Sequence, residues 1–333
     1  MANASLEGLG LVLAGGIAQG AFMAPSKWIR NWAWENYWLV FSFTSYLITP
    51  WLLAFLTIPR LFDIYAGSSA ASLISVGIFG SAWGVGAVTF GLGVDALGVA
   101  LGFAIILGVA TTVGTLVPLF IAMPPNFSSR QLQLTVLSLA VMLGGVVLCS
   151  FAGKWKERRL SITTNYNRGV LICVASGVLS ACGNLGFSFA SSITKRASEF
   201  GVPEALAPNA VWTLLTVPLF LCNFGFALFL LKKNRTGVNF RVTSWRRNFT
   251  LAVSMGALWM GGLSFYGSGA RKLGQMGTSL GFAIFMSSAV LVASTVGIAT
   301  GEWRNAPGKA MKQMSMGVFL LLVAICCLAL NRQ

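Results

Sequence analysis

The sequence predicts an all-α polytopic membrane protein, with ten transmembrane helices arranged as two inverted five-helix repeats. Three observations lead to this fold class. Of 333 residues, 56% are hydrophobic and only 9% are charged, whereas a soluble globular domain has about 25% charged residues. Ten stretches that are long enough to cross a bilayer contain no Asp, Glu, Lys or Arg. Finally, segments from the two halves of the chain are near copies of each other.

A helix needs roughly 20 mostly apolar residues to cross the hydrocarbon core. The charge-free stretches are rich in Leu, Ile, Val, Phe, Ala and Gly, and they lack the short alternating pattern of β-barrel strands. Within the fourth stretch, we expect Pro124-Pro125-Asn126 to end the helix. The expected spans are about 8–26, 36–59, 69–94, 97–122, 131–153, 169–194, 205–231, 248–270, 275–301 and 313–331.

The second half of the chain repeats the first. Residues 98–105 read GVALGFAI and residues 277–284 read GTSLGFAI, with six of eight positions identical. A constant shift of 176 residues aligns further pairs upstream: Gly80 and Gly256, Trp83 and Trp259, Gly86 and Gly262, Gly91 and Gly267, Gly93 and Gly269, Leu97 and Leu273, Gly98 and Gly274. Span 1 matches span 6 more weakly, through Gly8 and Gly16 against Gly169 and Gly177.

The repeat defines two domains. We expect a first five-helix repeat over 1–153, a basic cytoplasmic connection over 154–168 and a second five-helix repeat over 169–333. Because five is odd, the second copy enters the membrane from the opposite side, so the halves are inverted. Inverted halves suit alternating access, in which a central site opens to one side and then the other. The sequence therefore favours a transporter.

Basic residues in the connections predict the orientation. With ten spans, successive connections alternate between the two sides of the membrane. Sixteen of the 23 Lys and Arg residues lie on the side of the first connection, and seven lie on the other. Basic loops stay in the cytoplasm, so we expect both termini outside, in the periplasm of a bacterial-type inner (plasma) membrane. The net charge of +15 then faces an anionic leaflet, and no nucleic-acid partner is expected.

The titratable residues offer no catalytic centre. The chain has no histidine, and its eight acids all lie at span ends or in connections. The six cysteines lie inside expected spans without a C-x-x-C pair, so we expect them to pack as small apolar side chains. No nucleophile–base pair or metal-ligand cluster can be assembled. We therefore expect no enzyme, no cofactor and no metal site.

The same residues limit what is transported. A cationic solute usually needs a buried carboxylate and a polyanion a deep Lys or Arg, and the expected spans contain neither. The substrate should be small and neutral. Amide side chains donate to and accept from hydroxyls, and indole faces cover the C–H side of a sugar ring. Each candidate could equally serve helix packing. The candidate substrate-binding residues are Gln19, Trp83, Asn184, Trp259 and Tyr266.

Several segments resemble the L-rhamnose–proton symporter family, of the drug/metabolite transporter superfamily. The most specific is the W-x-W-E-x-x-W run preceded by A-P-x-K. The resemblance runs nearly end to end and is strongest over residues 20–120. It rests on MAPSKWIRNWAWENYW (23–38), LITPWLLAFLTIP (47–59), FGSAWGVGAVTFGLGVDALGVALG (79–102), GTLVPLF (114–120) and GEWRNAP (301–307).

The resemblance implies secondary active import of L-rhamnose, or a related neutral deoxysugar, together with a proton. It also implies ten spans in two inverted halves, with helices 1–4 and 6–9 lining the central cavity. That arrangement would bring Gln19, Trp83, Asn184, Trp259 and Tyr266 near the pathway. A single chain holds both halves, so a monomer could function alone.

The chain offers few titratable residues for proton coupling. Members of the family carry a histidine in span 1 and an acid in span 9, and this chain has neither. The remaining proton candidates are Glu35 and Asp95, both at cytoplasmic span ends. Glu35 matches the family run, but it could equally be an interfacial partner for Lys27 or Arg30. Sodium coupling, facilitated diffusion, export of another neutral metabolite or amino acid on this fold, and a non-transporting receptor remain alternatives.

Overall fold

A computed structural model describes residues 2–121, 123, 128–156, 166–301, 303–304 and 306–330. The part of the chain that it describes is helical and contains no strand. Ten of its helical segments are long and apolar enough to cross a membrane, so the predicted all-α fold with ten spans is confirmed. The helix end expected at Pro124-Pro125-Asn126 lies outside the described residues.

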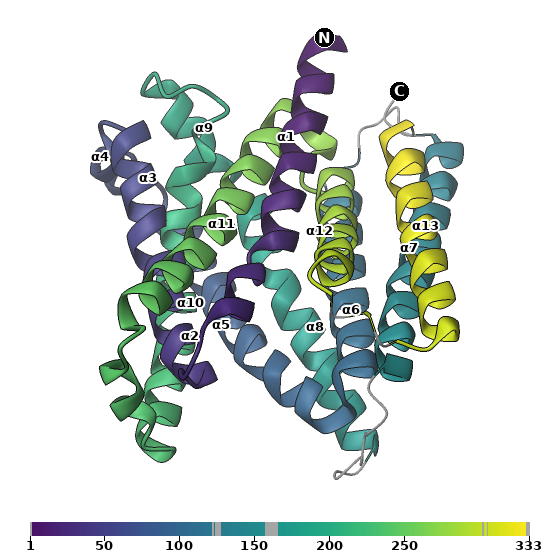
Figure 1. The fold of residues 1–333 in the computed structure, drawn as a ribbon. Coiled ribbons are helices and arrows are strands. Elements are labelled where there is room, and N and C mark those ends of the chain that lie inside the picture. Colours follow the sequence, from purple (N-terminus) through teal and green to yellow (C-terminus); the bar gives the residue numbers. More distant parts are fainter. Residues whose placement is uncertain are drawn as a thin grey trace.

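Nine of the ten spans contain one long helix each, and one is composite (Figure 1). The single long helices are α1 (Ala2–Ala21), α5 (Ala70–Leu97), α6 (Val99–Ile121), α7 (Ser129–Lys156), α8 (Tyr166–Phe189), α10 (Pro208–Lys233), α11 (Trp245–Lys272), α12 (Leu280–Ala299) and α13 (Gly308–Leu330). The composite span runs from α2 (Trp34–Ser42) through the π-helical segment η2 (Phe43–Ile48) into α3 (Thr49–Thr57).

Short helices form several of the connections. They are η1 (Ala24–Trp28), α4 (Leu61–Ala66), α9 (Ser191–Glu199), η3 (Thr236–Arg241) and η4 (Gly274–Met276). The expected span 169–194 is divided, because α8 ends at Phe189 and α9 begins at Ser191. Asp95, expected just beyond a span, lies in the last turn of α5.

The helix α1 begins and α13 ends at the same end of the bundle, which we call the terminal end (Figure 1). The opposite end, which we call the basic end, carries the connections between α1 and α2 and between α10 and α11. These connections contain Lys27, Arg30, Arg235 and Arg241.

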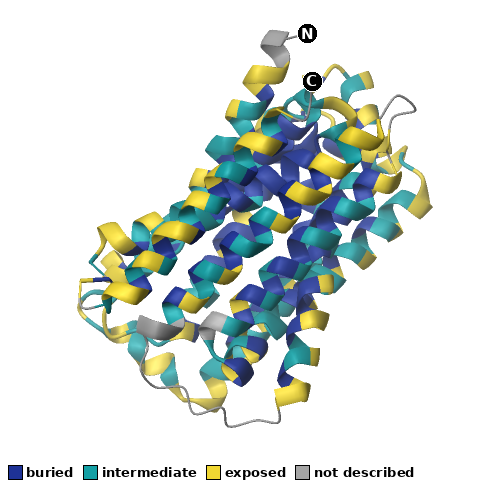
Figure 2. Cartoon of the chain, turned by 90° about the vertical axis from the view of Figure 1, so that its right-hand side faces the viewer, coloured by how far each residue is buried: buried dark blue, intermediate teal, exposed yellow. Residues whose placement is uncertain are grey.

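Two groups of three helices form the centre. In the first, α1 packs against α11 and α12, and in the second, α8 packs against α5 and α6. We call them the α1 group and the α8 group. The composite span packs against α10, while α7 and α13 pair beside the central groups (Figure 1). Buried positions follow the inner faces of the helices, and exposed positions lie outward and at the ends (Figure 2).

Glycines allow the closest helix crossings. A Cβ on Gly262 of α11 would come within 3.0 Å of the Gly15 carbonyl oxygen of α1, and a Cβ on Gly86 of α5 would come within 2.7 Å of the Ser180 nitrogen of α8. Small residues permit such approach in membranes, where lipid is as apolar as the helices and packing drives association.

The π-helical segment has a local cause. Pro50 has no N–H to donate to the carbonyl one turn earlier, and the hydroxyl of Thr49 instead donates to the carbonyl of Thr44 at 2.6 Å. Such widened turns often occur at functional sites. Here the widened turn contains Tyr46, whose ring lies edge-on to Trp259 at 4.7 Å between centroids.

Candidate functional site

The two repeat-related tryptophans meet at the centre of the bundle. Trp83 lies near the midpoint of α5 and Trp259 near the midpoint of α11. Their rings stack with 5.6 Å between centroids and 27° between planes. The contact joins the α8 group to the α1 group. Trp259 is buried and Trp83 is half-buried.

Aromatic side chains of the composite span surround Trp259. Phe41 and Tyr46 both lie edge-on to its ring, with centroids 6.4 and 4.7 Å away. On the other side, Gly183 of α8 leaves room for Trp83, because a Cβ there would come within 2.6 Å of the indole. Sequence reasoning missed Phe41, since nothing in its spacing reveals that span 2 lies beside span 8.

Gln19 of α1 supplies an unpaired acceptor. It lies beside Gly262 of α11, which is about one helical turn along that helix from Trp259. Its side-chain oxygen Oε1 is buried and accepts no hydrogen bond from any described residue. This oxygen lies against Gly262 of α11, 3.1 Å from where a Cβ would be. A buried acceptor without a donor costs free energy, so a hydroxyl-bearing ligand would be stabilised here.

Asn184 and Tyr266 bind each other. The Tyr266 hydroxyl donates to Asn184 Oδ1 at 2.5 Å. The Asn184 amide nitrogen donates to the carbonyls of Gly114 on α6 and Thr278 before α12, each at 2.7 Å. Both residues are buried. In this conformation the amide N–H groups are fully used, and the pair links the α8 group to the α1 group.

Glu35 lies at the basic end, away from the tryptophans. It is 5% exposed, and its Oε1 accepts hydrogen bonds from Thr236 at 2.7 Å and from Asn234 at 3.0 Å. These neutral donors belong to the connection between α10 and α11. The alternative partners have other contacts: Lys27 donates to Thr300 at 2.5 Å, and the main chain of Arg30 bonds Asn248.

The surrounding sequence explains how Glu35 is positioned. Asn31 takes a left-handed conformation, with φ of 60°, which asparagine tolerates better than most residues. The chain then enters α2, where the Asn36 side chain accepts from the Ala33 N–H at 3.0 Å and donates to the Thr236 carbonyl at 3.0 Å. Asp95, by contrast, is exposed.

No group of three or more His, Cys, Asp or Glu side chains is placed to hold a metal ion within the described residues. Of the seven candidates, the structure brings Trp83 and Trp259 together with Gln19 one turn away, and it pairs Asn184 with Tyr266. Glu35 and Asp95 are not part of this centre.

Known proteins match this chain along nearly its whole length. The family described as L-rhamnose-proton symport protein (RhaT) matches residues 1–332. The chain belongs to this L-rhamnose–proton symport family. Its members are transporters and not enzymes, and the chain is a multi-pass membrane protein with ten candidate spans.

Curated relatives match along nearly the whole chain. Proteins named L-rhamnose-proton symporter are similar in Citrobacter koseri (28% identical over 342 residues), Escherichia coli (28% over 342) and Cronobacter sakazakii (29% over 343). In each case the match covers 97% of this chain and 97% of the relative. The resemblance seen in the sequence motifs is thus confirmed.

Proposed function

We propose that this chain imports L-rhamnose, or a related neutral deoxysugar, together with a proton by alternating access. The family and the names of its relatives support the substrate class. The observation that carries the mechanism is the stacked pair Trp83 and Trp259. Related residues of two inverted repeats meet only on the pseudo-twofold axis, where a transporter of this type binds its substrate.

The helix contacts support two inverted repeats over 1–153 and 169–333. Gly8 of α1 lies against Leu273, and its counterpart Gly169 of α8 lies against Leu97. Leu97 and Leu273 are themselves a repeat pair. A Cβ added at either glycine would therefore meet the side chain of the corresponding leucine.

A second set of contacts repeats this relation. Gly16 lies against the carbonyl of Phe285, and its counterpart Gly177 lies against the carbonyl of Ile106. Ile106 and Phe285 are separated by 179 residues, the same separation as the two octapeptides that begin at 98 and 277. These contacts support a relation between the α1 group and the α8 group through the internal repeat.

In this proposal the sugar binds between the α1 and α8 groups, against Trp83 and Trp259. The indole faces cover its C–H side, and Gln19 Oε1 accepts a hydroxyl hydrogen. A charge-free site suits a neutral sugar, because an unpaired charge is costly within the membrane.

We assign proton coupling to Glu35 rather than to Asp95. Glu35 is buried and held by the neutral donors Asn234 and Thr236. A proton can discharge a carboxylate held in this way without leaving an unpaired cation behind. Exposed Asp95 would be screened by solvent in either state.

The basic end is assigned to the cytoplasm and the terminal end to the periplasm of an inner membrane, following the positive-inside rule. A monomer is proposed as the working unit, since both halves belong to one chain.

The test is uptake of radiolabelled L-rhamnose into proteoliposomes, with and without an inward proton gradient. We expect accumulation above equilibrium that a protonophore abolishes and a sodium gradient does not replace. Accumulation driven only by sodium would overturn the proton assignment. No uptake by protein that elutes as a single folded species would overturn the sugar assignment.

A further inference from the structure

Repeat-related glycines have different surroundings at the two ends of the molecule. A Cβ on Gly267 of α11 would come within 2.7 Å of the Trp212 indole and 2.9 Å of Pro208, both on α10. Its counterpart on α5, Gly91, has no neighbour within 4 Å and is exposed. Gly267 lies in the terminal half of the molecule and Gly91 in the basic half. Two positions that are equivalent in sequence are therefore closed at one end and open at the other.

Two aromatic pairs show the same difference. Tyr266 and Phe282 lie 5.8 Å apart in the terminal half, and both are buried, with 1% and 8% exposed. Their counterparts, Phe90 and Phe103, lie 4.9 Å apart in the basic half, where Phe103 is 37% exposed. Phe282 is covered by the opposite group, since a Cβ on Gly114 of α6 would come within 2.5 Å of its ring. No described glycine has Phe103 among its nearest neighbours.

The buried core has two parts. One large cluster of buried side chains joins the α1 group, α10, the composite span, α7, α13 and the terminal half of the α8 group, with Trp212 and Tyr266 among its members. A second, small cluster of Leu97, Ile106 and Cys173 lies in the basic half of the α8 group. Phe90 packs against this small cluster and not against the large one.

Polar contacts tie the terminal half together across the groups. Tyr266 and Thr278 bind Asn184 of α8. Ser264 of α11 donates to Asn209 of α10 at 3.3 Å, and Ser268 of α11 donates to the carbonyl of Ala205 in the connection before α10.

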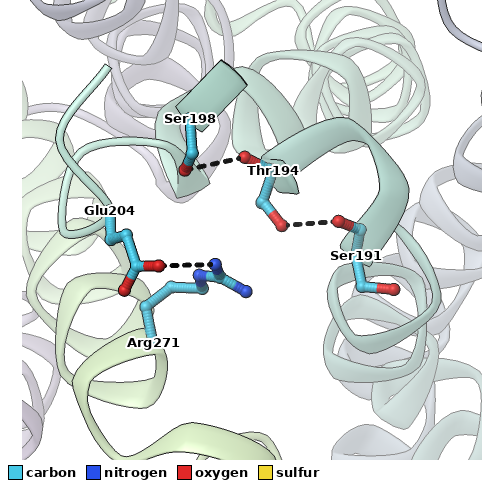
Figure 3. A network of polar contacts seen from close by, with 5 residues as sticks. All are labelled: Ser191, Thr194, Ser198, Glu204 and Arg271. Atoms are coloured by element: carbon cyan, nitrogen blue, oxygen red, sulfur yellow. Dashed lines mark hydrogen bonds and ion pairs between the residues drawn. The ribbon is translucent and has the colours of Figure 1, made fainter. Parts of the chain in front are cut away.

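At the rim of the terminal end, Arg271 pairs with Glu204 at 3.8 Å (Figure 3). The neighbouring hydroxyls of Thr194 and Ser198 bond carbonyls of their own helix, α9. These two hydroxyl bonds stay within α9, whereas the Arg271–Glu204 pair joins α11 to the connection before α10.

We propose that Asn184, Tyr266 and Gly267 form the gate of the terminal end, closed in this conformation, and that Phe90, Gly91 and Phe103 form its counterpart at the basic end, open in this conformation. The proposal rests on transport by alternating access. In the opposite conformation, Asn184 and Tyr266 separate, and Gly91 closes against the first turns of α2 as Gly267 now closes against α10.

Contacts within each group support a movement of rigid groups. Gly262 packs against Gln19 within the α1 group, and its counterpart Gly86 packs against Ser180 within the α8 group. Gly269 packs against Val12, and its counterpart Gly93 packs against Cys173. All four glycines have a close neighbour inside their own group. Gly91 and Gly267 differ only in their contact with a helix outside the two groups, which Gly267 has and Gly91 lacks. Closure of one end and opening of the other then requires only a rotation of the groups about the Trp83–Trp259 contact.

The test uses one matched pair of substitutions, Gly91→Leu and Gly267→Leu, in the full chain with its six cysteines replaced. Gly91→Leu has free space in this conformation and blocks closure of the basic end, so the variant should fold and remain in this conformation. Gly267→Leu should prevent closure of the terminal end. Uptake should fall at least tenfold in both variants.

The readout is labelling by a membrane-impermeant maleimide at Phe103→Cys or Phe282→Cys, in right-side-out and inverted vesicles. In the parent and in Gly91→Leu, we expect Phe103→Cys to label at least tenfold faster from the basic end than Phe282→Cys labels from the terminal end. Gly267→Leu should reverse this ratio. Gly91→Leu protein that transports at the parent rate, or equal labelling of both cysteines in all variants, would overturn the gate assignment.

Labelling needs no sugar, so the two proposals fail separately. Parent protein that shows the expected labelling but takes up no L-rhamnose would leave the gate in place and remove the substrate. Parent protein that takes up the sugar, with labelling in Gly267→Leu unchanged from the parent, would keep the substrate and remove the gate. If Gly267→Leu does not fold, the Gly91→Leu result alone still decides whether the basic end must close.

Discussion

Repeat-related residues have matching contacts at the centre of this molecule and different contacts toward its ends. At the centre, Trp83 and Trp259 stack directly on each other. Toward the ends, Gly267 is packed against α10 while Gly91 has no neighbour. Residues on the axis of two inverted halves must meet in every conformation, whereas residues away from it are equivalent only when both ends are in the same state. A single asymmetric conformation therefore distinguishes the proposed binding centre from the proposed gates.

The largest effect is expected at the basic end, from Glu35→Gln. The amide oxygen can still accept from Thr236 and Asn234, so the fold should be kept, but the side chain can no longer take up or release a proton. We expect proton-driven accumulation of L-rhamnose to be lost while exchange of labelled for unlabelled sugar continues. Counterflow and gradient-driven uptake are measured on the same proteoliposomes.

Asp95→Asn is the matched control, since it removes an exposed carboxylate at the same end. Its accumulation should equal that of the parent. Normal accumulation by Glu35→Gln would remove Glu35 from coupling and leave it as a residue that ties α2 to the connection after α10.

A smaller loss is expected at the centre, from Trp259→Ala and Trp83→Ala. Each substitution removes one indole from the stack, and every 1.4 kcal/mol of lost contact weakens binding about tenfold. We expect the sugar to bind each variant at least about tenfold more weakly, measured by equilibrium binding in detergent. Trp245→Ala, on an exposed tryptophan at the basic end, should leave affinity unchanged. Equal affinities for all three variants would place the sugar elsewhere.

The smallest effect is expected at the terminal end, from Tyr266→Phe. This change removes the hydroxyl that donates to Asn184 and keeps the ring. A hydrogen bond contributes about 0.5–1.5 kcal/mol net, so labelling of Phe282→Cys from the terminal end should rise about two- to tenfold. Tyr166→Phe, on an exposed residue at the basic end, should not change it. Unchanged labelling in Tyr266→Phe would mean that this bond does not hold the gate.

The sequence singled out the residues of the candidate site for different reasons, and only the structure shows how they are arranged. Trp83 and Trp259 were identifiable because an internal repeat marks them as equivalent. Gln19 was identifiable as an uncharged polar side chain deep in an apolar span. Asn184 and Tyr266 had the same features, and only the structure reveals that they bind each other. The burial of Glu35 and its bonds to Asn234 and Thr236 depend on a connection 199 residues further along the chain.

The sequence by itself determined the class of protein and the ten spans, because bilayer thickness and the cost of buried charge act on each segment locally. Tertiary structure alone decided which residues of the repeats meet, since contacts such as Gly15 with Gly262 join distant spans. It also decided which end is closed. In the sequence, Gly91 and Gly267 are equivalent and do not indicate which end is closed. In the structure, α10 packs against Gly267 and no described residue packs against Gly91.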